Sequence, residues 1–322
     1  MADYDVFNGD ADGICALLQL RLAEPRQSVL ITGVKRDIGL LKKVQLSDDP
    51  SADRVTVLDI SMDKNKEALE ATLASGASVQ YFDHHFAGDI PNHPNLQASI
   101  DTQAEICTGL LVNQHLQQAF PLWAVTAAFG DNLHQSASNA ANGLDLSADD
   151  MQKLEKLGTL LNYNGYGATV DDLFFAPDEL FKKLLPYENP LDFINQDDTF
   201  TTLDNGYQSD MNNARAVSAQ LATDACAMFV FPMEKWSRRV GGVYGNLLAR
   251  ENPDRAHALL SAISDDSYQV SVRAPLNRRE GADELCRQFA SGGGRKAAAG
   301  INVLPQSEVD NFSSAFEKQF AC

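Results

Sequence analysis

The sequence predicts an α/β protein with a parallel-sheet N-terminal domain and a smaller α/β C-terminal domain. In the first half, short apolar runs rich in β-formers alternate with helical patterns, as they do in βαβ units. Three of these runs lead into aspartates, which are Asp10 and Asp12, then Asp59, then Asp83. From about residue 225 an α/β pattern begins again, after a stretch that is mostly helical.

The N-terminal domain is expected over residues 1–195. Its predicted strands are 4–7, 28–33, 54–58 and 79–82, and its predicted helices are 14–22, 64–73, 106–120, 122–129, 149–161 and 178–185. Residues 162–167 combine Asn, Gly and Tyr, which predicts a turn-rich loop.

A helical linker is expected over residues 196–224, with its helix at 211–221, before a C-terminal domain over 225–322. In that domain the predicted strands are 227–231, 240–244, 268–272 and 299–304, and the predicted helices are 254–263 and 282–289. A glycine run precedes the last strand and predicts a loop there.

The composition is that of an ordinary globular protein, with 322 residues of which 44% are hydrophobic and 22% charged. No apolar run approaches the roughly 20 residues that cross a bilayer. The first residues are acidic and lead into a strand, so we expect no signal peptide. The five cysteines are scattered and form no CxxC pair, which favours reduced thiols and a cytoplasmic location.

The formal net charge of −18 restricts the class of partner. Long duplex nucleic acid is bound by Lys and Arg that neutralise phosphates, so it is a poor candidate. A small phosphorylated ligand stays open, because metal ions or a few cationic side chains can be concentrated locally.

The stretch 79–85 is the strongest single signal, because a short apolar strand stops at Asp83, His84 and His85. The carboxyl ends of parallel strands lie on one edge of a sheet, so the aspartates after the other strands should gather beside them. Several carboxylates in one crevice repel one another unless cations hold them. Oxygen and imidazole ligands suit Mn²⁺, Mg²⁺ or Co²⁺. Asp131 also follows an apolar segment and could close the site.

At these residues the chain resembles the DHH phosphoesterase superfamily, which includes nanoRNase/pAp phosphatases, single-strand exonucleases and exopolyphosphatase-related members. The matching motifs, in order, are Asn8–Gly13, Val57–Asp59, Asp83–His85 and Gly130–Asp131. In the second half, Val270–Arg273 and Phe289–Gly300 are similar to the DHH-associated C-terminal domain.

The resemblance implies a two-metal hydrolase whose substrate lies in a cleft between the domains. By motif position Asp10 would bind the first ion, Asp12 the second, and Asp59 both. His84 and Asp131 would complete the second ion's ligands. Two divalent ions, with Mn²⁺ favoured and Co²⁺ or Mg²⁺ as alternatives, would activate a bridging water and neutralise phosphoryl charge.

The resemblance also implies substrate contacts on both domains. His85 would face the substrate and take part in catalysis, while Asp83 would orient His84 or His85. In the C-terminal domain, Arg273 and the run Gly293, Gly294, Arg295 and Lys296 would grip phosphate groups.

Two positions depart from the family pattern. Asn8 stands where the single-strand exonuclease branch has an aspartate, and no histidine precedes residue 84. Asn8 is therefore a further, weaker candidate ligand for the first ion. Arg295 stands where the C-terminal motif usually has histidine, which favours a more anionic substrate.

Three functions remain open on this evidence. The first is hydrolysis of a small phosphoester, such as a short oligonucleotide, a cyclic nucleotide or a 3′-phosphonucleotide. The second is a short-chain exopolyphosphatase that cuts phosphoanhydrides. The third is a catalytically quiet metal- or nucleotide-binding module. A homodimer is a further candidate assembly.

Overall fold

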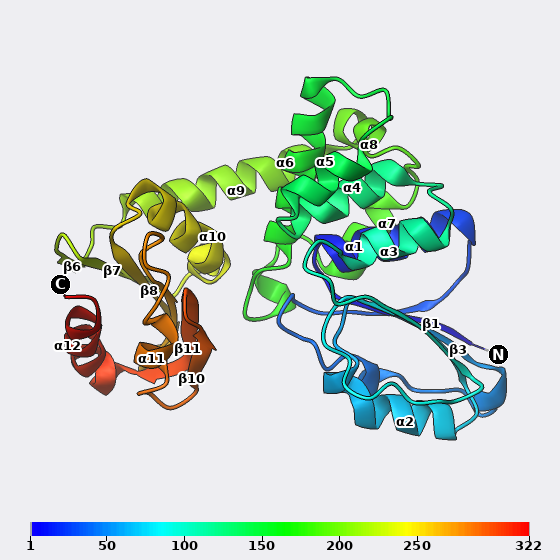
Figure 1. Cartoon of the computed structure of the whole chain (residues 1–322), viewed down its shortest axis with the longest axis horizontal. Coiled ribbons are helices and arrows are strands. Elements are labelled where there is room, and N and C mark those ends of the chain that lie inside the picture. Colours follow the sequence, from blue (N-terminus) through cyan, green and yellow to red (C-terminus); the bar gives the residue numbers. More distant parts are fainter. Residues whose placement is uncertain (1, 322) are drawn as a thin grey trace. The chain divides into compact units, whose positions relative to one another are not determined.

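The computed structural model describes residues 2–321, and the chain divides into two compact units, Met1–Asn205 and Gly206–Cys322. Each unit has its own sheet, so the expected pair of α/β domains is confirmed (Figure 1). Among the described residues, no helix has both the length and the apolar character that crossing a membrane requires. Cys15, Cys107, Cys226 and Cys286 are unpaired and buried, whereas Cys322 lies outside the described residues.

The N-terminal unit is built on a five-stranded sheet in the order β2-β1-β3-β4-β5, with all neighbouring strands parallel. Its strands are β1 (Asp3–Phe7), β2 (Val29–Ile31), β3 (Arg54–Leu58), β4 (Ser78–Asp83) and β5 (Leu96–Ile100). The first four were predicted. β5 was missed because it pairs with β4 alone and its centre is exposed, so it lacks an apolar run.

The two faces of this sheet are covered by different helices. Helix α2 (Lys66–Ala74) packs on one face, where its Leu69 and Leu73 join alternate strand residues such as Val57 and Tyr81 in one core (Figure 1). Helix α1 (Ala11–Ala23) packs on the other face and is buried on nearly every side. The reason is a second helical layer behind it, which contains α3 (Thr108–His115), α4 (Pro121–Gly130) and α6 (Ala148–Asn164).

The remaining helices of this unit are α5 (His134–Ala140), α7 (Pro177–Leu184) and α8 (Pro190–Gln196). Helix α9 (Asp198–Ala216) crosses the boundary between the units. It was predicted at 211–221 and lies further toward the N-terminus. The end of α6 also corrects a prediction, since Asn162–Asn164 belong to the helix and not to a loop.

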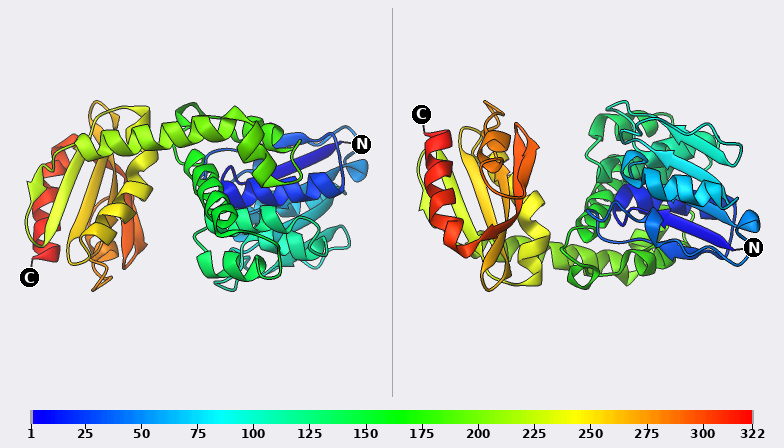
Figure 2. Two further views of the ribbon diagram at one scale, coloured as in Figure 1. Left: turned by 90° about the horizontal axis from the view of Figure 1, so that it is seen from above. Right: turned by 90° about the horizontal axis from the view of Figure 1, so that it is seen from below.

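The C-terminal unit has a six-stranded sheet in the order β10-β11-β9-β8-β7-β6, in which only β7 and β8 are parallel neighbours. The strands are β6 (Leu221–Ala222), β7 (Cys226–Phe231), β8 (Ala256–Ser264), β9 (Ser267–Arg273), β10 (Gly292–Arg295) and β11 (Ala298–Pro305). Helices α10 (Lys235–Glu251) and α12 (Val309–Phe320) cover opposite faces, and α11 (Ala282–Cys286) lies near β10 and β11 (Figure 2).

Two segments of this unit were assigned the wrong kind of regular element, a helix for a strand and a strand for a helix. Residues 254–263 were predicted as a helix, but most of them form β8, which is buried on both faces and therefore shows a continuous apolar run without alternation. Residues 240–244 were predicted as a strand but lie within α10. Three glycines weaken its helical signal, while Val240, Tyr244 and Leu248 recur every four residues along its buried face. Helix α12 was missed.

Candidate metal centre

The predicted motif residues of the N-terminal unit meet at the carboxyl edge of its sheet. From β1 the chain continues to β2 on one side of β1, and then to β3 on its other side. The connections that leave the neighbouring strands β1 and β3 therefore run in opposite directions along the sheet. Such a switch in strand order is where open α/β sheets form their sites. Asp10 and Asp12 follow β1 here, and Asp59 follows β3.

Asp12 is held by the first residues of α3. The backbone N–H groups of Thr108 and Gly109 each donate to one of its carboxylate oxygens, at 2.7 Å. A Cβ atom on Gly109 would lie 2.4 Å from the Cβ of Ala127, so only glycine allows this approach. The helix N-terminus thus fixes a buried carboxylate and leaves its other lone pairs for a ligand.

Asp59 reaches the centre through an unusual backbone conformation. Its φ of 58° lies in the left-handed region, which costs energy and is common at functional sites. Its N–H donates to the carbonyl of Phe82 at 3.0 Å, and the Thr108 hydroxyl donates to its Oδ1 at 3.1 Å. Burial, followed by the nearby carboxylates, Asp12 foremost, raises the pKa of Asp59 well above its ordinary value.

The His84 ring has one nitrogen fixed and the other turned to the acids. Its Nδ1 lies 2.9 Å from the carbonyl oxygen of Ile106, which can only accept, so Nδ1 carries the proton. Its Nε2 lies 3.4 Å from Asp59 Oδ1 and 3.9 Å from an oxygen of both Asp12 and Asp131. A divalent cation between Nε2 and these carboxylates would be held by both the imidazole lone pair and the carboxylate charges.

These residues fit a divalent cation. Ligand atoms that share one Mg²⁺ at roughly 2.1 Å stand about 3 to 4 Å apart, which is the spacing around His84 Nε2. Burial, then the charge of Asp12, raises the pKa of Asp131 to about 6, although Lys35 partly offsets this. Asp59, His84 and His85 are a second grouping, and their ligand atoms all lie within 4.8 Å of one another. We favour the grouping around His84 Nε2, because Asp83 already engages His85.

His85 and Asp83 form a pair beside the centre. Asp83 is fully buried at the end of β4, and its Oδ1 lies 2.7 Å from Nδ1 of the half-exposed His85 ring. This hydrogen bond, against the opposing effect of burial, raises the pKa of His85. Of the two histidines that the sequence offered as partners, Asp83 orients His85.

Asp10 has different partners. Its Oδ1 accepts the N–H groups of Asp12 and Gly13 at 3.1 Å, which caps α1. Its Oδ2 lies 2.6 Å from Lys35 Nζ. Burial would raise the pKa of Asp10, but Lys35 and the Gly13 N–H outweigh it, so the pKa lies below its ordinary value. Gly13 is required here, since a Cβ would lie 2.3 Å from the Asn8 carbonyl oxygen.

Sequence reasoning missed four residues of the centre: Thr108, Gly109, Lys35 and Asn162. The first two act through backbone or hydroxyl groups that no motif marks. Lys35 Nζ also lies 2.8 Å from Asn162 Oδ1 on α6, and 3.8 Å from Asp131 Oδ1. A lysine soon after the second strand was the one available signal, because that loop opens at the same edge.

The predicted phosphate-binding residues lie in the C-terminal unit. Arg273 on β9 and Arg295 on β10 both pair with Ala298 on β11, so the two arginines project from one face with a small residue between them. Arg273 donates to Asn246 at 2.6 Å, and Arg295 and Lys296 are exposed. The run with Gly293 and Gly294 is the edge strand β10, not the expected loop.

No family model and no curated protein matches the chain. Solved structures do match. A DHH-domain protein, described as a member of a family of ribosomal proteins, has a TM-score of 0.67 at 13% identity, over 99% of this chain and 86% of that one. The exonuclease RecJ bound to manganese has a TM-score of 0.65 at 15% identity, over 99% of this chain and 90% of that one.

A pGpG-specific phosphodiesterase, PggH from Vibrio cholerae, gives a TM-score of 0.60 at 16% identity and covers 98% of both chains. At such identities the likeness concerns the fold, and it extends over both units in all three cases. The chain therefore has the fold of the DHH-domain proteins, as its motifs predicted.

Proposed function

We propose that the protein is a divalent-metal-dependent hydrolase that cleaves a phosphoester bond in a small anionic substrate. The observation that carries this is the His84 ring, whose Nε2 faces the carboxylates of Asp12, Asp59 and Asp131 while Nδ1 is fixed by the Ile106 carbonyl. A buried acid cluster around an imidazole lone pair has a clear chemical use as a cation site.

The ligands of this ion would be Asp12, Asp59, His84 and Asp131. Mn²⁺ is favoured, with Mg²⁺ and Co²⁺ as alternatives, because the ligand set mixes oxygen with imidazole nitrogen. When bound, a divalent ion lowers the pKa of a water molecule and neutralises phosphoryl charge. The matched RecJ structures are titled as complexes with Mn²⁺ or Mg²⁺.

His85 is the proposed proton donor. Its half-exposed ring lies beside the acid cluster, and the hydrogen bond that it donates to Asp83 keeps it protonated to a higher pH than an ordinary histidine. A protonated imidazole at this place can give a proton to the leaving oxygen. Asp83 would act through His85 as a positioning residue.

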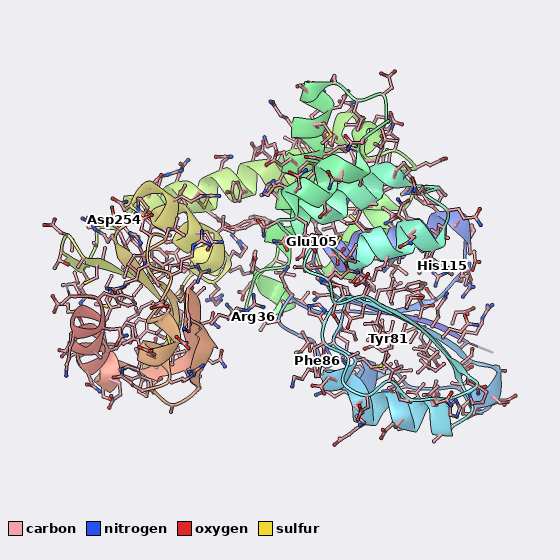
Figure 3. The ribbon with its side chains drawn as sticks, in the orientation of Figure 1. Arg36, Tyr81, Phe86, Glu105, His115 and Asp254 are labelled. Carbon is pink, nitrogen blue, oxygen red and sulfur yellow. The ribbon has the colours of Figure 1, made fainter. Side chains whose placement is uncertain are left out.

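The favoured substrate is a nucleotide or a short oligonucleotide. Phe86 directly follows His85 and is 73% exposed, so its ring is available for a base to stack on. Figure 3 labels it, together with the exposed Arg36 of the loop after β2; both follow strand ends at the carboxyl edge. The names of RecJ and PggH, an exonuclease and a pGpG-specific phosphodiesterase, agree with this class.

Cleavage of short polyphosphate is the second candidate. Arg273 and Arg295 project from one face of the C-terminal sheet, and the exposed Lys296 follows Arg295 in the chain. Cationic side chains would suit an anionic chain that has no base. A quiet binding module is the third candidate, which the test below also addresses.

The test is turnover of pApA, cyclic AMP, pAp and tripolyphosphate with Mn²⁺, Mg²⁺, Co²⁺ or excess chelator. We expect metal-dependent hydrolysis of at least one nucleotide substrate, and a loss of about 10²-fold or more in His84→Ala. His134→Ala is the matched control, because His134 is exposed and its ring lies near Glu155 and Phe129. Turnover of no substrate with any metal would make the protein a binding module.

A further inference from the structure

We propose that the Lys35 ammonium takes the place of one of the two metal ions expected at this edge, so that the chain holds a single divalent ion. This inference rests on the proposed function, because it concerns the same centre. It departs from the expectation that Asp10 binds a first ion beside the ion held by Asp12.

The surroundings of Asp10 leave little room for a metal ion. A carboxylate has about four lone-pair positions, and three donors already use Asp10. They are the N–H groups of Asp12 and Gly13 on Oδ1, and the Lys35 ammonium at 2.6 Å from Oδ2. Asp10 is thus a helix cap and an ion-pair partner.

Lys35 is held in place from several directions. Its N–H donates to the carbonyl of Gly165 at 2.8 Å, and its own carbonyl lies 3.5 Å from Asn8 Nδ2. The ammonium reaches Asn162 Oδ1 at 2.8 Å and lies 5.9 Å from the centre of the Tyr166 ring. About three quarters of the side chain is buried, its exposed fraction being 26%. These contacts hold the Lys35 side chain in one position at the centre.

The ammonium also lies against the carboxylate that the expected first ion would share with Asp59. It is 2.6 Å from Asp10 Oδ2 and 3.8 Å from Asp131 Oδ1. A divalent ion bound to Asp10 would have to displace the ammonium or lie next to it, and like charges at that range repel strongly.

Asn8 supports the same conclusion. It supplies a neutral amide where a carboxylate would add negative charge, so the centre needs less positive charge. Its Oδ1 is buried and has no partner among the described residues, so it is a ligand atom still open to a second ion. A single amide oxygen beside an ammonium is a poor site for a hard cation.

The primary test is the number of Mn²⁺ ions bound by the full wild-type chain, measured by equilibrium dialysis with metal analysis. We expect one ion per chain at saturation and the six-line electron paramagnetic resonance spectrum of isolated Mn²⁺. Two ions with a spin-coupled spectrum would overturn the inference and leave the proposed hydrolase intact. No bound ion together with no turnover would refute the proposed function itself.

A pair of variants tests the role of Lys35 directly. Lys35→Met removes the ammonium at similar length, and Lys35→Met combined with Asn8→Asp adds a carboxylate ligand. We expect the double variant to bind two Mn²⁺ per chain. Lys43→Met is the control and should keep one, since Lys43 is exposed and pairs only with Asp37. If the folded double variant still binds a single ion, Lys35 does not exclude the second one.

Discussion

Two groups of buried carboxylates in the N-terminal unit have opposite surroundings. In the middle of β1, Asp5 is fully buried and accepts two hydrogen bonds from Arg21, at 2.7 and 2.5 Å, and one from the Ser28 hydroxyl at 2.5 Å. At the carboxyl edge of the sheet, Asp12, Asp59 and Asp131 face one imidazole nitrogen, and no arginine approaches them among the contacts described above.

This difference indicates that Asp5 stabilises the fold, whereas the acids around His84 are arranged for a ligand. The charge of Asp5 is matched within the protein, so the folded chain needs nothing more there. Burial, followed by mutual repulsion, raises the pKa values of Asp59 and Asp131 at the metal centre. Such a mismatch is tolerated where a ligand supplies the missing charge.

Asp59→Asn should have the largest effect, because it should lower activity and raise stability. Asparagine keeps the shape and accepts the left-handed backbone of this position, but it is a much weaker metal ligand. We expect hydrolysis to fall about 10³-fold or more, because metal stabilisation is worth several kcal/mol. The chelated variant should melt at a higher temperature than chelated wild type, since a repelling charge is gone.

Calorimetry in excess chelator and steady-state rates measure both effects. Asp48→Asn serves as the control, because Asp48 is exposed and precedes the amino end of β3, whereas Asp59 follows its carboxyl end. A rate within tenfold of wild type for Asp59→Asn would remove Asp59 from the metal ligands.

Asp5→Ala should lower stability and leave activity almost unchanged. It leaves the Arg21 guanidinium buried without a charge partner, which typically costs about 3–5 kcal/mol of stability. Activity per folded molecule should stay within about twofold, because Asp5 lies in the middle of β1 and its hydrogen-bond partners, Arg21 and Ser28, are not residues of the metal centre. Urea unfolding measures the loss. The double variant Asp5→Leu with Arg21→Met should recover most of it, and failure to recover would mean that packing, not charge, is responsible.

The smallest effect concerns pH. The pKa of Asp131 is about 6 in the folded chain, above its ordinary value, so the metal-free folded state binds this proton more tightly than the unfolded state does. Its contribution to stability is therefore complete below about pH 4 and lost as pH rises through about 6.

In chelator, we expect the free energy of unfolding of Asp131→Asn to rise relative to that of wild type as pH increases from 4 to 8, by about 3 kcal/mol at most. Denaturation curves at the two pH values measure this difference. A constant gap between the two proteins would show that Asp131 titrates normally. With metal present the sign should reverse, because protonation below pH about 6 removes a ligand.

Much of this centre was predictable because it is built from local patterns. The first four strands have alternating or continuous apolar runs, and Asp10, Asp12, Asp59 and Asp83 follow them directly in the sequence. A parallel sheet then brings strand ends together whatever the loops do. The secondary structure of the C-terminal unit was harder to predict, because β8 is buried on both faces and the glycines of α10 weaken its helical pattern.

The sequence by itself determined the two-domain α/β organisation, the motif order and the identity of the acids and histidines at one edge of the first sheet. Only the tertiary structure decided which groups those residues contact. Lys35 reaches Asp10 and Asn162 across separations of 25 and 127 residues, and α3 holds Asp12 across 96. These contacts depend on helix packing between distant segments, which no local periodicity encodes, and they set the charge of the centre.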